Sequence, residues 1–193
     1  MRRTRLTTNS RNVFSQKGLT LLEMLVAVAV LAIILTTVAP SIQSVLIKNK
    51  ITADINNLSA VLQRARFTAV DEQANVILCP TTNYTACTNS WKNAMMVFAD
   101  VNGNGNRDNS ETLIVASDAL NSANTIYGIT GSITFDEQGG IDKAATITVC
   151  PKDNDADYAS ALLLSLYGRI SVAVDSDGDG SKEDLEGDAL ACS

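Results

Sequence analysis

The sequence predicts an α+β fold in which a long N-terminal helix, membrane-spanning in its first half, packs on an antiparallel β-sheet head. Three observations predict this class. Residues 19–39 are almost wholly apolar, and apolar residues then recur at helical spacing. From Ala74 onward, short β-rich runs alternate with Gly, Asn, Asp and Ser. A helix followed by consecutive strands is typical of the α+β class.

The charge of the chain is unevenly distributed. Residues 1–18 contain five basic residues and no acid, and without them ten basic residues face 21 acidic ones, a net charge of −11. An acidic remainder argues against nucleic-acid binding as the main role, because that binding depends on Lys and Arg. The sequence contains no His, which removes the commonest general base and metal ligand. No nucleophile elbow, phosphate-binding loop or zinc-spaced Cys set appears, so we expect a non-enzymatic protein.

The first element is the apolar run Leu19 to Ala39, whose 21 residues carry Glu23 as their only charge. A helix of about 20 apolar residues is long enough to cross a hydrocarbon layer. Because the basic residues precede it, we expect a cytoplasmic N-terminus, a single membrane crossing and an exported head. A cleaved secretory signal is the alternative, but residues 36–40 contain no A-x-A cleavage pattern.

The helical pattern continues past Pro40. Apolar residues recur at spacings near three and four as far as Phe67, with polar residues between them. We therefore expect one helix from about residue 19 to about 72, kinked near Pro40 because proline lacks the backbone donor and crowds the preceding turn. The second half is amphipathic and requires a partner surface.

Seven β-rich runs follow the helix and predict an antiparallel sheet packed on its amphipathic half. Residues 164–172 read as a hairpin or a bent strand. The predicted strands are Asn75–Cys79, Met95–Ala99, Thr112–Ala116, Ser132–Phe135, Thr146–Cys150, Leu162–Tyr167 and Ile170–Val174.

The four cysteines all follow the apolar run, and in an exported chain an even number of cysteines indicates disulfides. Three pairings are open, and the sequence alone does not select among them. We favour Cys79–Cys87, which would clamp a short loop, together with Cys150–Cys192, which would tie the C-terminus to a strand.

Two segments match the calcium-loop pattern D-x-[DN]-x-[DN]-G-x5-E in every fixed place. In Asp175–Glu186 the ligand positions are Asp175, Asp177, Asp179, Ser181, Glu183 and Glu186, and we name these residues as a candidate calcium site. In Asp100–Glu111 several positions are Asn, which offers an uncharged oxygen, so we expect weaker binding there. Neither loop is preceded by the helix of an EF-hand, and the alternative is a solvated acidic turn.

The segment KGLTLLEMLVAVAVLAII resembles the class III signal of type IV prepilins and type II secretion pseudopilins. The resemblance implies that a prepilin peptidase cuts after Gly18 and that the new N-terminus, Leu19, is methylated. Glu23 is then the glutamate at the fifth mature position, and Pro40 is the helix-breaking proline at position 22. The family more often begins with Phe, so Leu19 is a departure.

A second stretch is similar to the GspH/FimT group within that family. That group has an Arg-rich end to the long helix, a strand ending Leu-Cys-Pro and a Phe-x-Asp-x-Asn-Gly-Asn loop. Here these features match Arg64, Arg66, Cys79, Pro80, Cys87, Trp91, Phe98, Asp100, Asn102, Gly103, Asn104, Arg107, Asp108 and Glu111. The two resemblances cover about residues 15–115, and after that the match is looser, down to Gly168-Arg169.

The resemblance implies four regions: a leader at 1–18, a transmembrane and filament-core helix at 19–40, an amphipathic half-helix at 41–73 and a β-rich head at 74–193. It implies a minor pilin in a tip or initiation complex, with the prepilin peptidase, the major pilin and other minor pilins as partners. It also implies a single-pass protein of the bacterial inner membrane whose head is periplasmic until the subunit enters an extracellular pilus. Assembly would depend on Glu23, neutralising the amine of Leu19 of its own chain or of a neighbour.

Two alternatives remain open. The first is a type II secretion pseudopilin, which would share the fold and the processing. The second is a DNA-binding competence pilin, because some FimT proteins bind DNA through a Gly-Arg-x-Arg motif. Here the corresponding stretch is Gly168-Arg169-Ile170-Ser171, which lacks the second arginine and precedes strongly acidic residues.

Overall fold

The computed structural model describes residues 18–193, apart from the side chains of residues 37–41. The chain divides into two compact units, one ending at Ile42 and one spanning Gln43–Ser193. Of the predicted leader, residues 1–17 lie outside the described residues.

Helix α1 runs from Leu21 to Glu72, which confirms the expected single helix to within two residues at its start. It continues as helix through Pro40, where the kink stays a prediction. Its C-terminus is a Schellman-type turn: Gln73 adopts a φ of 49°, and the Ala74 N–H donates to the Ala69 carbonyl oxygen at 3.2 Å. This turn stops the helix and reverses the chain into the first strand.

Within Gln43–Ser193, α1 buries one face in the main hydrophobic core. The buried positions recur every three or four residues, as expected for the inward face of an amphipathic helix. They are Ile51, Ile55, Leu58, Val61, Leu62, Ala65 and Ala69. The helix therefore supplies one wall of the core of the head.

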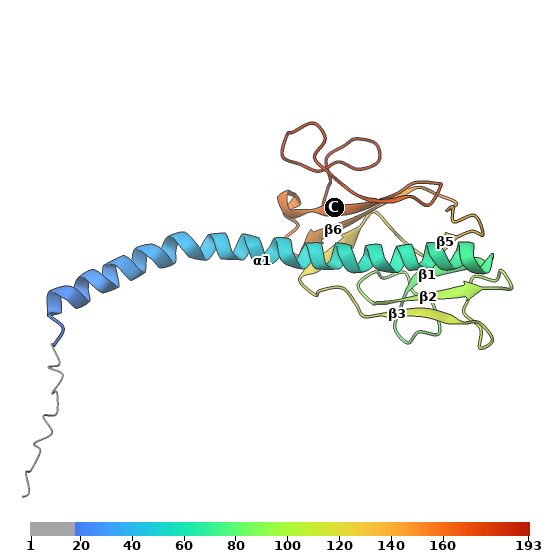
Figure 1. Ribbon diagram of the computed structural model, residues 1–193, viewed down its shortest axis with the longest axis horizontal. Helices are drawn as coiled ribbons and strands as arrows, with labels where there is room; N and C mark the ends of the chain where they lie inside the picture. Colours follow the sequence, from blue (N-terminus) through green and yellow to red (C-terminus); the bar gives the residue numbers. More distant parts are fainter. Residues whose placement is uncertain (1–17) are drawn as a thin grey trace, which may run out of the picture. The chain divides into compact units, whose positions relative to one another are not determined.

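Two four-stranded antiparallel sheets complete the head, with strand orders β3-β2-β1-β5 and β4-β6-β7-β8. In Figure 1 β1, β2 and β3 lie on one side of the second half of α1, and β6 lies on the other side. The strands are β1 Asn75–Thr81, β2 Ala94–Asp100, β3 Leu113–Ser117, β4 Asn124–Tyr127, β5 Ile133–Phe135, β6 Ala145–Pro151, β7 Ser160–Leu164 and β8 Ile170–Val172, with a 3-10 turn η1 at Ala156–Tyr158.

The α+β fold class is confirmed, but the head contains two sheets where the sequence indicated one. Strand β4 was missed because its four residues carry little alternation and lie between polar loops. The predicted strand Leu162–Tyr167 ends earlier, at Leu164, since residues 165–169 form a tight turn in which the Gly168 N–H donates to the Ser165 carbonyl. The β7–β8 hairpin itself is as expected.

Each sheet also has an outer face, and a small apolar cluster covers each one. Ile77, Cys79, Met96 and Phe98 form the cluster on the first sheet, with Tyr84 and Cys87 packed against it. Cys150, Ala159, Ala161, Ala173 and Leu190 form the cluster on the second sheet, with Cys192 packed against it. Each outer face is therefore covered by a segment that carries a disulfide cysteine, Cys87 on the first sheet and Cys192 on the second.

Candidate functional site

The N-terminal motif is organised by a helix cap. The Thr20 hydroxyl accepts a hydrogen bond from the Glu23 N–H at 3.2 Å, and the Thr20 carbonyl accepts from the Met24 N–H at 3.1 Å. Thr20 is thus the N-cap of α1, and Glu23 lies in the first turn, where the helix dipole favours a negative charge. Sequence reasoning missed Thr20, although Thr-x-x-Glu is a capping-box pattern that could have revealed it.

The start of α1 is apolar on all sides. Large side chains from Leu21 to Leu35 are between roughly half and four-fifths exposed, with Leu21 at 79% and Ile34 at 49%. Contiguous apolar surface of this extent is normally covered by protein or lipid. Among the residues that the structure describes, no helical stretch reaches the length and hydropathy that crossing a membrane requires.

At the other end of α1, Arg66 joins the helix to the β5–β6 connection and to the β7–β8 turn. Its Nε donates to the Gly139 carbonyl at 3.0 Å, and an Nη donates to the Tyr167 carbonyl at 3.2 Å. Gly168 has a φ of 68°, and a Cβ there would overlap the Gly139 carbonyl oxygen. Two residues that the GspH/FimT resemblance singled out, Arg66 and Gly168, therefore meet in one structural junction.

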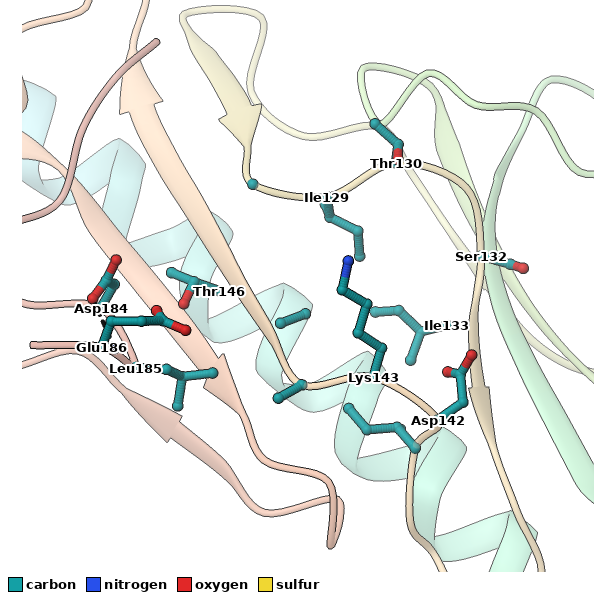
Figure 2. A pocket seen from close by; sticks show the side chains of 14 residues that line it. Ile129, Thr130, Ser132, Ile133, Asp142, Lys143, Thr146, Asp184, Leu185 and Glu186 are labelled. Carbon is teal, nitrogen blue, oxygen red and sulfur yellow. Dashed lines mark hydrogen bonds between the residues drawn. The ribbon is translucent and has the colours of Figure 1, made fainter. Parts of the chain in front are cut away.

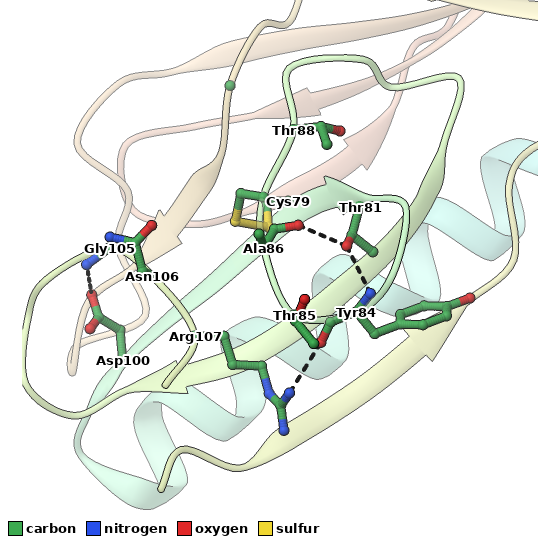
Figure 3. The surroundings of a disulfide bond; sticks show 12 residues. Cys79, Thr81, Tyr84, Thr85, Ala86, Thr88, Asp100, Gly105, Asn106 and Arg107 are labelled. Carbon is green, nitrogen blue, oxygen red and sulfur yellow. Dashed lines mark hydrogen bonds between the residues drawn. A yellow bond between two sulfur atoms is a disulfide. The ribbon is translucent and has the colours of Figure 1, made fainter. Parts of the chain in front are cut away.

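The first disulfide joins Cys79 and Cys87, one of the two pairs that we favoured. Figure 3 shows it beside the loop that it closes, where the Thr81 hydroxyl donates to the Ala86 carbonyl at 2.8 Å and accepts from the Tyr84 N–H at 2.9 Å. Arg107 donates from an Nη to the Tyr84 carbonyl at 3.1 Å. The disulfide loop is thereby linked to the Asp100–Glu111 loop.

The Asp100–Glu111 loop is filled by its own hydrogen bonds. Asp100 accepts from the N–H groups of Asn104 and Gly105, at 3.1 and 3.0 Å. The buried Glu111, 4% exposed, accepts from the Val101 N–H through Oε1 and from the Asp108 N–H through Oε2. The carboxylates at both ends of the pattern are therefore already engaged by backbone donors.

The Asp175–Glu186 loop brings four carboxylates together instead. One oxygen from each of Asp175, Asp177, Asp179 and Glu183 lies within 4.8 Å of the others. Asp175 also accepts from the N–H groups of Gly178 and Gly180, and Asp179 accepts from the Ser181 N–H. Carboxylate oxygens at this density are the ligands that Ca²⁺ prefers.

Glu186, expected as the twelfth calcium ligand, is not among these converging carboxylates. The chain turns back earlier, because the Glu183 N–H donates to the Val174 carbonyl and residues 183 and 189 form an isolated bridge. Glu183, 8% exposed, instead accepts both the N–H and the hydroxyl of Ser176 through Oε2. Of the six candidate ligand residues, the structure thus brings the carboxylates of four together, and calcium binding stays a prediction.

Lys182 fixes this loop to the second sheet. Its ammonium group donates to the Ala159 carbonyl at 3.1 Å. Burial lowers the pKa of Lys182, and the nearby positive charge of Lys48 lowers it further. Lys48 itself lies over the ring of Tyr158, 5.7 Å from its centroid.

The second disulfide joins Cys150 and Cys192, the other favoured pair, and closes a segment with a sequence separation of 42. This segment includes the whole Asp175–Glu186 loop. Within this loop, Asp184, Leu185 and Glu186 line a cavity of about 410 Å³. Lys143 points into the cavity from the β5–β6 connection (Figure 2). The cavity walls also include Ile129 and Ile133.

Comparison with known proteins agrees with this architecture. The family described as type II transport protein GspH matches residues 54–168, more than half of the chain, and the prokaryotic N-terminal methylation motif matches residues 14–39. Curated protein sequences gave no match.

Solved structures share the fold. The type IV minor pilin FimU of Pseudomonas aeruginosa is similar with a TM-score of 0.54 and 18% identity, over 65% of this chain and 90% of that chain. The minor pseudopilin EpsH from the type 2 secretion system of Vibrio cholerae is similar with a TM-score of 0.50 and 8% identity, over 66% and 99%. The chain therefore belongs to the GspH family and carries the prokaryotic N-terminal methylation motif.

Proposed function

We propose that this chain is a minor type IV pilin, a structural subunit of the tip or initiation complex of a pilus. The observation that carries the proposal is the exposed apolar surface of Leu21–Leu35 on a helix whose second half belongs to a disulfide-bonded head. Apolar surface of this size must be covered. Neighbouring pilin helices cover it in the filament core, and before assembly the inner membrane holds residues 19–40.

Processing by a prepilin peptidase follows from the N-terminal motif. Gly18 is exposed, and a Cβ placed on it would have no atom within 4 Å, so the residue is open to an enzyme. Cleavage after Gly18 leaves Leu19 as the methylated N-terminus, one residue before the Thr20 cap. The positive amine of Leu19 then lies close in sequence to Glu23, which neutralises an amine of its own chain or of a neighbour in the apolar filament core.

A type II secretion pseudopilin is the second candidate. The match to the GspH family and the likeness to EpsH favour it, and its subunits would pack by the same apolar helix. Deleting the gene separates the two roles. Loss of surface pili and twitching supports the pilus, whereas loss of enzyme secretion with pili intact supports the pseudopilus.

The test of processing is mass spectrometry of the mature N-terminus. We expect a chain that begins at N-methylated Leu19, and an intact Met1 would overturn the proposal.

The test of assembly is Glu23→Ala in the full chain. We expect normal cleavage but loss of the subunit from the sheared filament fraction, since the amine is left without a counter-charge in an apolar environment. Glu72→Ala, an exposed acid at the other end of the same helix, is the matched control and should assemble normally. Glu23→Ala at wild-type levels in filaments would contradict the assigned role.

A further inference from the structure

The β2–β3 connection contains two Asn-Gly pairs, Asn102-Gly103 and Asn104-Gly105, and all four residues are exposed. Asparagine before glycine is chemically labile, because glycine has no Cβ to hinder the attack of its own backbone nitrogen on the asparagine side chain. The attack closes a cyclic imide and releases ammonia. Since the two pairs have the same composition and lie in the same loop, any difference in their reactivity depends on their hydrogen bonds.

The two asparagine side chains are held in the same way. The Oδ1 of Asn102 accepts from the Asn104 N–H at 3.0 Å, and the Oδ1 of Asn104 accepts from the Asn106 N–H at 2.7 Å. Each Nδ2 donates to Oδ2 of Asp108, at 2.7 Å from Asn102 and 2.9 Å from Asn104. A donor to Oδ1 stabilises the negative charge that develops there during nucleophilic attack. The two side-chain amides are therefore comparable as electrophiles.

The two attacking nitrogens differ. The Gly105 N–H donates to Oδ2 of the Asp100 carboxylate at 3.0 Å (Figure 3). This nitrogen must break a charge-assisted hydrogen bond before it can turn towards Asn104, and the adjacent negative charge opposes the loss of its proton. The Gly103 N–H donates to no acceptor among the residues that the structure describes. The nitrogen that can attack Asn102 is therefore free, and the one that can attack Asn104 is engaged.

We propose that Asn102 is a site of spontaneous deamidation, whereas the neighbouring Asn104 is protected. The Gly103 nitrogen loses its proton and bonds to Cγ of Asn102, the bond between Cγ and Nδ2 breaks, and Nδ2 leaves with a proton as ammonia. Water then opens the cyclic imide at either of its carbonyl groups, which yields aspartate or isoaspartate. The reaction needs no oxidant and no enzyme, so it proceeds with time in the folded head. The inference holds for a pilin and a pseudopilin alike, because it rests on contacts within one loop.

The carboxylate that deamidation creates would lie among other acids. The Asn102 Nδ2 that donates to Asp108 is replaced by an oxygen that cannot donate, so two carboxylates face each other at hydrogen-bond distance. Asp100 and Asn102 also line a cavity of about 460 Å³ together with Glu72 and Glu137. Because like charges at such short range repel, we expect the modification to open the loop.

The test measures deamidation at each asparagine of the full chain. The purified protein is incubated in detergent at mildly alkaline pH, and samples taken over time are digested with trypsin. Cleavage after Lys92 and Arg107 releases the peptide 93–107, which contains both Asn-Gly pairs. Fragmentation in the mass spectrometer assigns the mass gain to Asn102 or Asn104. We expect Asn102 to react about tenfold faster, since one charge-assisted hydrogen bond separates the two attacking nitrogens.

Two controls separate the effect of the hydrogen bond from that of the local sequence. In denaturant the loop contacts are lost, and both asparagines should react at similar rates. Asp100→Ala removes the acceptor of the Gly105 N–H, so the rate at Asn104 should rise towards that at Asn102. If this variant does not fold, the comparison of the folded with the denatured wild-type chain still decides.

The consequence for the loop is tested by introducing the product directly. Asn102→Asp should lower the midpoint of thermal unfolding, because it places a carboxylate against Asp108. Asn109→Asp makes the same charge change on an exposed side chain of the same connection and should leave the midpoint unchanged.

Three outcomes would overturn the inference. Equal rates in the folded chain, or a faster reaction at Asn104, would show that the hydrogen bond to Asp100 does not protect. An unreactive Asn102 in the folded chain, together with reaction in denaturant, would show that the contacts of its side chain block the attack. Equal unfolding midpoints of Asn102→Asp and Asn109→Asp would show that the modification does not open the loop.

Discussion

The loops Asp100–Glu111 and Asp175–Glu186 carry the same spacing of Asp, Asn, Gly and Glu, but they are organised in different ways. In the first, amide groups of Asn102 and Asn104 donate to Asp108 at 2.7 and 2.9 Å, and backbone donors engage Glu111. In the second, four carboxylates converge. The carboxylates of both loops accept hydrogen bonds from their own loop, so the two loops differ in charge. Asn occupies the central positions of the first loop and Asp those of the second, which concentrates negative charge there.

The difference has a structural cause beyond the Asn-to-Asp exchange. The first loop is a β2–β3 connection whose ends are held by paired strands. The second follows β8 and is held by the Lys182 and Glu183 contacts and by the disulfide that reaches Cys192. Variants of the disulfides, the buried glutamates, the calcium ligands and Lys182 should therefore affect stability to different and decreasing extents.

Removal of the longer disulfide should have the largest effect. Cys150→Ser with Cys192→Ser releases a loop with a separation of 42 residues, and chain entropy predicts a loss of about 4 kcal/mol in unfolding free energy. The matched pair Cys79→Ser with Cys87→Ser opens a separation of only 8 residues and should cost about 2.5 kcal/mol. Denaturant unfolding of the full chain in detergent measures both. A larger loss from the short loop would show that packing, and not loop length, sets the contribution.

Replacing the buried Glu111 and Glu183 by glutamine should change the free energy of unfolding by different amounts, because the two carboxylates accept hydrogen bonds in different ways. Glu111 accepts through both oxygens, so Glu111→Gln points an NH₂ group at a backbone N–H and should cost about 2 kcal/mol. Glu183 accepts twice through one oxygen, which a glutamine carbonyl can replace, so Glu183→Gln should change stability by less than about 0.5 kcal/mol. Thermal unfolding in chelator compares them, and equal losses would contradict the distinction.

Calcium should stabilise only the second loop. At a free concentration ten times the dissociation constant, binding adds about 1.4 kcal/mol to the unfolding free energy. Asp177→Asn with Asp179→Asn should abolish this gain, and Glu186→Gln should preserve it because Glu186 lies outside the converging carboxylates. Calorimetry without heat at millimolar calcium would refute the site. Loss of binding in Glu186→Gln would instead favour the EF-hand arrangement that the sequence pattern predicts.

The pH dependence of Lys182 should give the smallest effect. Its pKa is lowered from 10.5 in the folded chain, so between the lowered value and 10.5 the unfolded chain binds the extra proton. The free energy of unfolding therefore rises with pH through that window, and above pH 10.5 the contribution of Lys182 no longer changes. Lys182→Met should flatten the rise in a pH series of unfolding curves, whereas Lys92→Met, on an exposed lysine, should not.

Much of the molecule follows from local sequence properties. The long helix, seven of the eight strands and the β7–β8 hairpin follow from periodicity and turn residues, which act over a few positions. Thr20 could also have been found locally, from the Thr-x-x-Glu spacing. Strand β4 could not, because it pairs with β6 more than 20 residues away and has almost no pattern of its own.

The N-terminal methylation motif, the family and the acidic character of the head can all be read from the amino-acid sequence. Three features became visible only in the folded chain: the strands divide into two sheets, Arg66 meets Gly168, and Glu186 is absent from the converging carboxylates that include Glu183. The physical reason is that these features depend on contacts between segments far apart in the chain. Such contacts are set by how the faces of helix and sheets bury one another, which spacing along the sequence does not encode.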